Sequence, residues 1–73
     1  MLVAEVKDKL IELLAESKPI DIEVGFGKGQ FVIQKAEKYR DVNFLGFEVK
    51  KKLVEYAQAS IESLKLSNIY VEC

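Results

Sequence analysis

Three glycines within five positions constrain this 73-residue chain more than any other feature of its sequence. Gly25, Gly27 and Gly29 follow the alternating segment 20–24 (Ile-Asp-Ile-Glu-Val) and precede the amphipathic segment 30–39. Glycine at this density neither stiffens a helix nor packs in a strand, so the pattern predicts a loop. The β-branched alternation before the loop predicts a strand, and the segment after it predicts a helix. The chain must therefore contain a strand, a tight loop and a helix in direct succession.

An amphipathic helix is predicted ahead of that strand. Apolar residues recur at steps of three and four over segment 1–17, which places them on one helical stripe. They are Val3, Val6, Leu10, Leu13 and Leu14. Pro19 disfavours helical geometry at Lys18, so we expect the helix to end before it.

The alternation of helix and strand continues after the loop. In segment 30–39, Val32, Ala36 and Tyr39 share one helical face. The apolar run 44–48 is bounded by turn residues and predicts a strand that is buried on both faces. Segments 50–65 and 69–73 predict a third helix and a third strand. The apolar face of the third helix is predicted at Leu53, Ala57, Ile61 and Leu64.

This order of elements predicts an α/β fold. One helix is followed by β-α-β-α-β, and alternation at these spacings indicates parallel βαβ units. Right-handed crossovers would place each strand beside its predecessor, in the order 3-2-1. That arrangement is one half of a Rossmann-like, doubly wound parallel sheet.

Composition limits the chemistry that the chain can perform. Apolar residues make up 49% and charged residues 32%, which is typical of a globular protein. The net charge of −1 gives no indication of a basic surface that binds nucleic acid. The chain has no histidine and a single cysteine, which excludes histidine acid–base chemistry and Cys/His zinc sites, and we expect no metal site. No apolar run approaches the ~20 residues that cross a bilayer.

The glycine loop predicts a ligand site at the carboxyl end of its strand. A dinucleotide fingerprint needs Gly-x-Gly-x-x-Gly, and its third glycine would fall at Gln30. A P-loop pattern is not found in the chain. Glu23, two residues before Gly25, is a poor neighbour for a pyrophosphate but can accept a hydrogen bond from an ammonium group. These residues favour a ligand with a cationic end.

A second acid indicates the rest of the ligand. Glu48 lies 19 residues after Gly29, at the end of the second predicted strand, where a carboxylate can accept both hydroxyls of a ribose. S-adenosylmethionine carries both an ammonium group and a ribose without a 2′-phosphate. The predicted cofactor-binding residues are Glu23, Gly25, Gly27, Gly29 and Glu48. The alternative is that the glycines serve packing alone and that Glu48 simply begins the third helix.

The same residues resemble a known family. Segment 19–31 looks like motif I of class I methyltransferases, in the Glu-x-Gly-Phe-Gly-Lys-Gly form of the tRNA (guanine-N7)-methyltransferase family. Segment 43–48 (Asn-Phe-Leu-Gly-Phe-Glu) is similar to that family's Asn-Phe-x-Gly-x-Glu motif, and segment 66–69 resembles its lead into the third strand. The resemblance covers positions 19 to 73.

The resemblance implies a role for each matching residue. Glu23 would lie at the methionine end of S-adenosylmethionine, Gly25 and Gly27 would shape the loop, and Glu48 would hold the ribose. It also implies a cytoplasmic enzyme that methylates N7 of a guanine in tRNA. The family's next cofactor-binding acid, its catalytic Asp and its basic tRNA surface follow later in the sequence. We therefore expect residues 1–73 to be the N-terminal part of a single truncated methyltransferase domain, with no catalytic residue and no activity alone.

Two other readings remain open. The chain could be a dinucleotide-binding half-domain of an NAD-type oxidoreductase, although Glu23 and Gln30 argue against this. It could also be a non-enzymatic fragment that associates with itself through an exposed edge of strand 20–24. We further expect Phe26 to anchor the loop by packing on the sheet.

Overall fold

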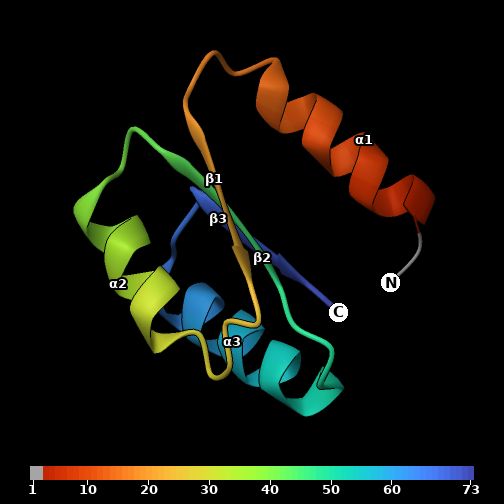
Figure 1. The fold of residues 1–73 in the computed structure, drawn as a ribbon. Coiled ribbons are helices and arrows are strands. Elements are labelled where there is room, and N and C mark those ends of the chain that lie inside the picture. Colours follow the sequence, from red (N-terminus) through yellow and green to blue (C-terminus); the bar gives the residue numbers. More distant parts are fainter. Residues whose placement is uncertain (1–2) are drawn as a thin grey trace.

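The computed structural model describes residues 3–73 and contains three helices and three strands (Figure 1). They are α1 (Val3–Leu14), β1 (Ile20–Val24), α2 (Gln30–Lys38), β2 (Asn43–Phe47), α3 (Lys51–Leu64) and β3 (Ile69–Glu72). The predicted order of elements is confirmed within this range. Positions 1 and 2 and the side chains of residues 3–5, among them the predicted apolar residue Val3, lie outside the description.

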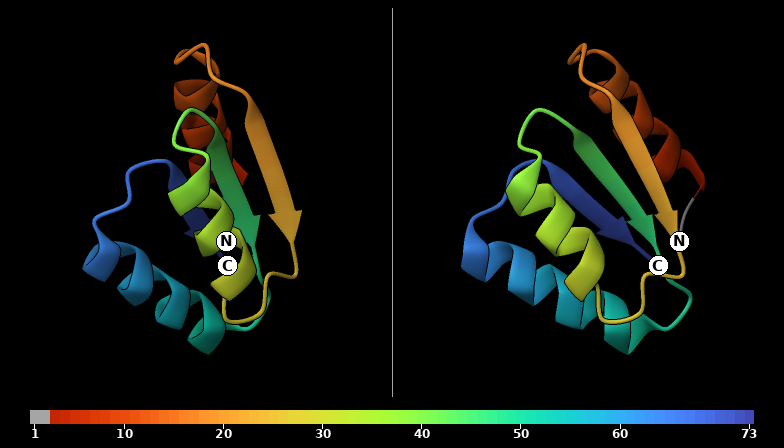
Figure 2. Two further views of the ribbon diagram at one scale, coloured as in Figure 1. Left: turned by 90° about the vertical axis from the view of Figure 1, so that its left-hand side faces the viewer. Right: turned by 60° about the vertical axis from the view of Figure 1, so that its left-hand side comes forward.

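The three strands form one parallel sheet in the order β1-β2-β3. Leu45 at the centre of β2 is level with Ile22 on β1 and with Tyr70 on β3. This is the predicted order 3-2-1 of one half of a doubly wound sheet. Helices α2 and α3 cover one face of the sheet and α1 lies on the other (Figure 2). Lys9 of α1 reaches Tyr70 on that second face, with Nζ 4.8 Å from the ring centroid.

The main core lies between the sheet and the two helices α2 and α3. Its buried members are Val32, Ile33, Ala36, Phe44, Val54, Ala57, Leu66, Ile69 and Val71. Ala36 and Ala57 are completely buried, so both helices approach the sheet through small side chains. On β2, Phe44 belongs to this core, and the buried Leu45 points by alternation to the face of α1. The expectation that this strand is buried on both faces is confirmed.

The predicted helical faces are wrong at three C-terminal positions. Leu14, Tyr39 and Leu64 are 64%, 45% and 46% exposed, respectively. Each lies at the last residue of its helix or just past it, where the chain leaves the helical path toward the next strand. The fully buried positions of α3 are Val54 and Ala57. Val54 was not on the predicted face, and the predicted Leu53 and Ile61 are only partly buried, so the buried face of α3 is shifted from the predicted stripe.

The side chain of Asn68, just before β3, holds the connection between α2 and β2 in place. Its side chain is 4% exposed, and its Nδ2 atom lies within hydrogen-bonding distance of three carbonyl oxygens. These belong to Ala36 (2.9 Å), Tyr39 (3.1 Å) and Val42 (3.0 Å). The two hydrogens of this amide are thus shared among carbonyl groups at the end of α2 and in the turn that follows it. None of the helices in residues 3–73 has the length and apolarity that crossing a bilayer requires.

Candidate functional site

The glycine loop leaves the carboxyl end of β1 and turns directly into α2. Gly25, Gly27 and Gly29 have φ angles of 72°, 64° and 83°, in the left-handed region that favours glycine. A Cβ atom at Gly25 or Gly27 would meet nothing within 4 Å, whereas one at Gly29 would lie 3.1 Å from the Cβ of Ala57. The first two glycines thus leave open space beside the backbone. The third also lets α2 begin close to α3.

Phe26 anchors this loop on the sheet, as expected. Its ring packs against the main core and crosses the backbone of Gly46 in β2. A Cβ atom at Gly46 would lie 2.9 Å from Phe26 Cδ2 and 3.2 Å from Val71 Cγ1. Gly46, the glycine of the Asn-Phe-Leu-Gly-Phe-Glu segment, is therefore required by the Phe26 ring. This contact between Phe26 and Gly46 was not predicted from the sequence. Its only signal was an isolated glycine inside an apolar strand, which can mark a close approach.

Glu48 joins the loop after β1 to the loop after β2. Its side chain is buried, with Oε1 accepting a hydrogen bond from the amide of Gly27 and Oε2 one from the amide of Lys50, both at 3.0 Å. These backbone donors, first Lys50 and then Gly27, lower the pKa of Glu48 below its usual value. The carboxylate is therefore ionised at neutral pH. Each oxygen keeps lone-pair capacity for a further donor.

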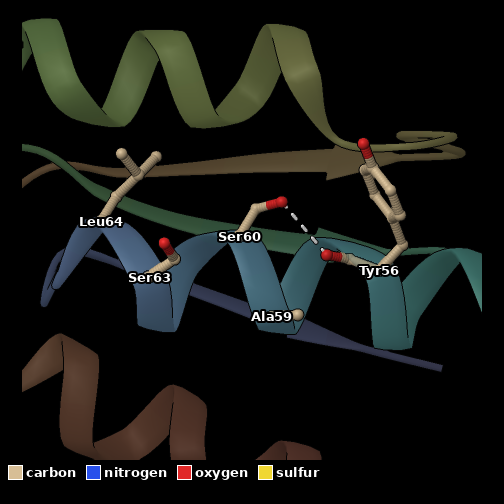
Figure 3. Close-up of a pocket in the computed structure, with 5 residues that line it drawn as sticks. All are labelled: Tyr56, Ala59, Ser60, Ser63 and Leu64. Atoms are coloured by element: carbon tan, nitrogen blue, oxygen red, sulfur yellow. Dashed lines mark hydrogen bonds between the residues drawn. The ribbon is translucent and has the colours of Figure 1, made fainter.

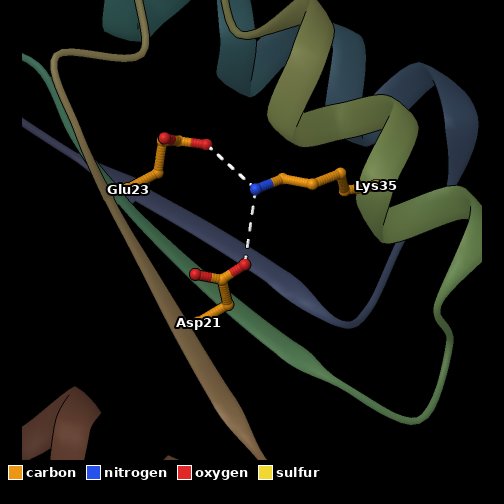
Figure 4. A network of polar contacts seen from close by, with 3 residues as sticks. All are labelled: Asp21, Glu23 and Lys35. Carbon is orange, nitrogen blue, oxygen red and sulfur yellow. Dashed lines mark hydrogen bonds and ion pairs between the residues drawn. The ribbon is translucent and has the colours of Figure 1, made fainter.

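Glu23 lies on the face of the sheet that α2 covers, beside a lysine that the sequence did not single out. Lys35 Nζ is 3.2 Å from Glu23 Oε1 and 3.3 Å from Asp21 Oδ2 (Figure 4). The pKa of Lys35 is raised, mainly by its contact with Glu23 and also by Asp21, against an opposing effect of burial. Nothing in the sequence pattern signals this cluster, because it depends on how α2 is placed over β1.

A small pocket of about 130 Å³ lies at the carboxyl edge of the sheet. Its lining residues are Val24, Gly25, Phe47, Glu48, Val49 and Cys73. Gly25 and Glu48, two of the five predicted site residues, thus meet at one pocket. Gly27 reaches it through its hydrogen bond to Glu48, Gly29 lies at the start of α2, and Glu23 is not among the lining residues. The space fits one portion of a nucleoside, since whole-ligand pockets usually measure ~300–1,000 Å³.

A larger hollow of about 430 Å³ lies along α3 (Figure 3). It is lined by Tyr56, Ala59, Ser60, Ser63 and Leu64, and Ser60 Oγ donates to the Tyr56 carbonyl at 3.2 Å. No charged group lines it, and neither predicted acid is part of it. The smaller pocket is favoured as the candidate site because Glu48 and Gly25 of the glycine loop both line it. Among the described residues, no group of three or more His, Cys, Asp or Glu side chains could hold a metal ion.

Comparison with known proteins places the chain in a methyltransferase family. Residues 17–73 match a family model described as "Putative methyltransferase", and the chain belongs to this family. A tRNA (guanine-N(7)-)-methyltransferase of Oceanobacillus iheyensis is 37% identical over 60 residues, covering 82% of this chain and 28% of that protein. One of Latilactobacillus sakei is 44% identical over 55 residues, covering 75% and 26%, respectively. The resemblance to the tRNA (guanine-N7)-methyltransferase family is confirmed, and the chain spans less than a third of these relatives.

A solved structure shares the fold. The structure of PKMT2 from Rickettsia typhi in complex with AdoHcy superposes with a TM-score of 0.67 at 24% identity. The match covers 78% of this chain and 11% of that one. The expected class of fold, a Rossmann-like α/β methyltransferase fold, is therefore confirmed.

Proposed function

We propose that this chain forms the S-adenosylmethionine-binding part of a tRNA (guanine-N7)-methyltransferase. The observation that carries the proposal is the bridge made by Glu48, which ties the glycine loop to the start of α3 at the edge pocket. Support comes from the family model, from the relatives named as tRNA (guanine-N(7)-)-methyltransferases and from the AdoHcy complex of a protein with the same fold.

The residues present fit this cofactor. The open space beside Gly25 and Gly27 lets a ligand approach the backbone. Glu48 is ionised, and each of its oxygens can accept one further hydrogen bond from a ribose hydroxyl. Glu23 is one-third exposed, which lets its carboxylate receive the ammonium group of the methionine end. Gly29 sets the path of the loop into α2.

When bound, the cofactor supplies a sulfonium methyl group that guanine N7 can take by in-line displacement. An unprotonated N7 carries a free lone pair, so none of the chain's residues has to act as a base. The contribution of Glu23, the glycine loop and Glu48 is to bind and orient, and fixed geometry of this kind can supply much of a rate enhancement. This assignment suits a chain without histidine.

The partner and setting follow from the same proposal. The substrate is tRNA, the location is the cytoplasm, and residues 1–73 are the N-terminal part of a single cofactor-binding domain. No catalytic residue is assigned within them. We expect no methyl transfer by the isolated chain, because no described residue is assigned to guanine recognition. Incubation with tRNA and labelled S-adenosylmethionine measures this, and transfer above background would contradict it.

Calorimetry with two ligands tests the binding proposal. We expect S-adenosylhomocysteine to bind more tightly than NAD, because Glu23 is a poor neighbour for a pyrophosphate and a good one for an ammonium group. A chain with Glu48→Gln should lose affinity for S-adenosylhomocysteine, since the neutral amide is a weaker acceptor for the ribose. Tighter binding of NAD would instead support the dinucleotide half-domain.

A further inference from the structure

Lys35 already contacts the carboxylate that the proposed function gives to the ligand's ammonium group. Its Nζ atom reaches Oε1 of Glu23 from α2 and Oδ2 of Asp21 at the same time (Figure 4). Oε1 of Glu23 is buried, and within the described part of the chain it accepts no well-formed hydrogen bond. Among the described residues, the partner of this oxygen is the ammonium group of Lys35.

The charges of this cluster leave one negative charge uncompensated. It holds two carboxylates and one ammonium group, and contact with both acids keeps Lys35 protonated. Lys35 is the least exposed of the three side chains at 27%, against 33% for Glu23 and 46% for Asp21. Its Nζ also lies 5.0 Å from the ring centroid of Phe31 and 5.8 Å from that of Phe44. Lys35 is therefore slightly less exposed than the two acids that it contacts, and part of the Glu23 side chain stays open to solvent.

We infer that Lys35 is an internal cation that competes with the ligand's ammonium group for Glu23, and that Asp21 weakens this competition by drawing Lys35 toward itself. The inference rests on the proposed function. A second cation at Glu23 would be repelled by Lys35 at close range. Asp21 shares the lysine charge and so leaves part of the Glu23 carboxylate available. Lys35 and Asp21 thus act through Glu23, as residues that set the affinity for a cationic ligand.

A purely structural role for Lys35 makes a different prediction. If the lysine only held Glu23 in place, removing either Lys35 or Asp21 would disturb the carboxylate and weaken ligand binding. Competition requires effects of opposite sign. Removing Lys35 takes the cluster from a charge of −1 to −2, whereas neutralising Asp21 takes it from −1 to 0.

The test compares two ligands on four forms of the chain. The ligands are S-adenosylhomocysteine and its deamino analogue, which has hydrogen in place of the ammonium group and keeps the carboxylate. The forms are the unsubstituted chain, Lys35→Met, Asp21→Asn and Lys35→Arg. The measured quantity is the affinity for S-adenosylhomocysteine divided by the affinity for the deamino analogue. This ratio reports the contribution of the ammonium group, because binding of the adenosine and any contact of Lys35 with the ligand's carboxylate are common to both ligands.

We expect Lys35→Met to raise this ratio about threefold to fivefold and Asp21→Asn to lower it by a similar factor, the size typical of partly exposed charge pairs. Lys35→Arg keeps the charge and should stay close to the unsubstituted ratio. Salt at about 0.5 M should shrink both changes, because it screens exposed charges. A ratio that is unchanged, or lowered in both variants, would overturn the inference alone. Failure of the unsubstituted chain to bind S-adenosylhomocysteine would overturn the proposed function as well.

Discussion

At the scale of single residues, the ring of Phe26 leaves no room for a side chain at Gly46. The ring lies where a side chain would begin, and Val71 closes the other side. We expect Gly46→Ala to destabilise the fold by about 1–3 kcal/mol, the usual cost of overpacking a core. Phe26→Leu in the same chain should recover part of that loss, because the smaller side chain leaves room. Chemical denaturation of both single variants and the double variant measures the coupling, and strictly additive losses would contradict the contact.

Glu48 makes the stability of the folded chain depend on pH in the acidic range. Its pKa is lowered in the folded state, so its contribution to stability is complete above the unfolded pKa and is lost as pH falls through the folded value. We expect thermal stability to fall at acidic pH and this fall to be smaller in Glu48→Gln, which cannot titrate. Melting temperatures of the two chains between pH 7 and pH 2 check the difference. Parallel curves would show that Glu48 is not the group responsible.

Lys35 makes the stability of the folded chain depend on pH in the alkaline range. Its raised pKa means that its contribution is present below the ordinary lysine pKa and disappears as pH rises through the folded value. We expect the unsubstituted chain to lose stability at strongly alkaline pH to a greater extent than Lys35→Met. Thermal melts above pH 10 measure this, and equal losses in both chains would contradict it.

At the scale of elements, Asn68 couples the end of α2 to the start of β2 and to the lead into β3. We expect Asn68→Ala to cost about 1–3 kcal/mol, because it leaves buried carbonyl groups without a donor. Ser67→Ala, at the exposed neighbouring position, is the matched control and should change little. Hydrogen exchange should accelerate most in the last turn of α2. Uniform acceleration across the sheet would argue for a general loss of packing instead.

The element order, the strand order and the glycine loop could be predicted from sequence because they rest on local periodicity and turn chemistry. The contacts that build the site could not. The Glu23–Lys35 pair depends on how α2 lies over β1, and the Phe26–Gly46 contact joins two segments that are separate in sequence. Glu48 was predicted as a ligand residue, but its bond to the loop amide of Gly27 appears only once the two strands are side by side.

At the scale of the whole molecule, β1 has no partner along its outer edge among residues 3–73. Ile22 and Val24 on this strand are 54% and 79% exposed. Because open strand edges with apolar side chains invite pairing, we expect the chain to self-associate at high concentration. Val24→Lys should shift light scattering toward the monomer, with Lys65→Ala as a control far from the edge. A clean monomer of the unsubstituted chain at millimolar concentration would contradict the expectation.

The central claim is that the glycine loop and Glu48 together bind the nucleoside part of S-adenosylmethionine, and backbone NMR tests it most directly. During titration with S-adenosylhomocysteine, we expect the largest shifts at the amides of Gly25, Gly27 and Lys50, since the last two donate to Glu48. Shifts confined to the hollow at Tyr56 and Ser60 would contradict the claim, as would a spectrum that the ligand leaves unchanged.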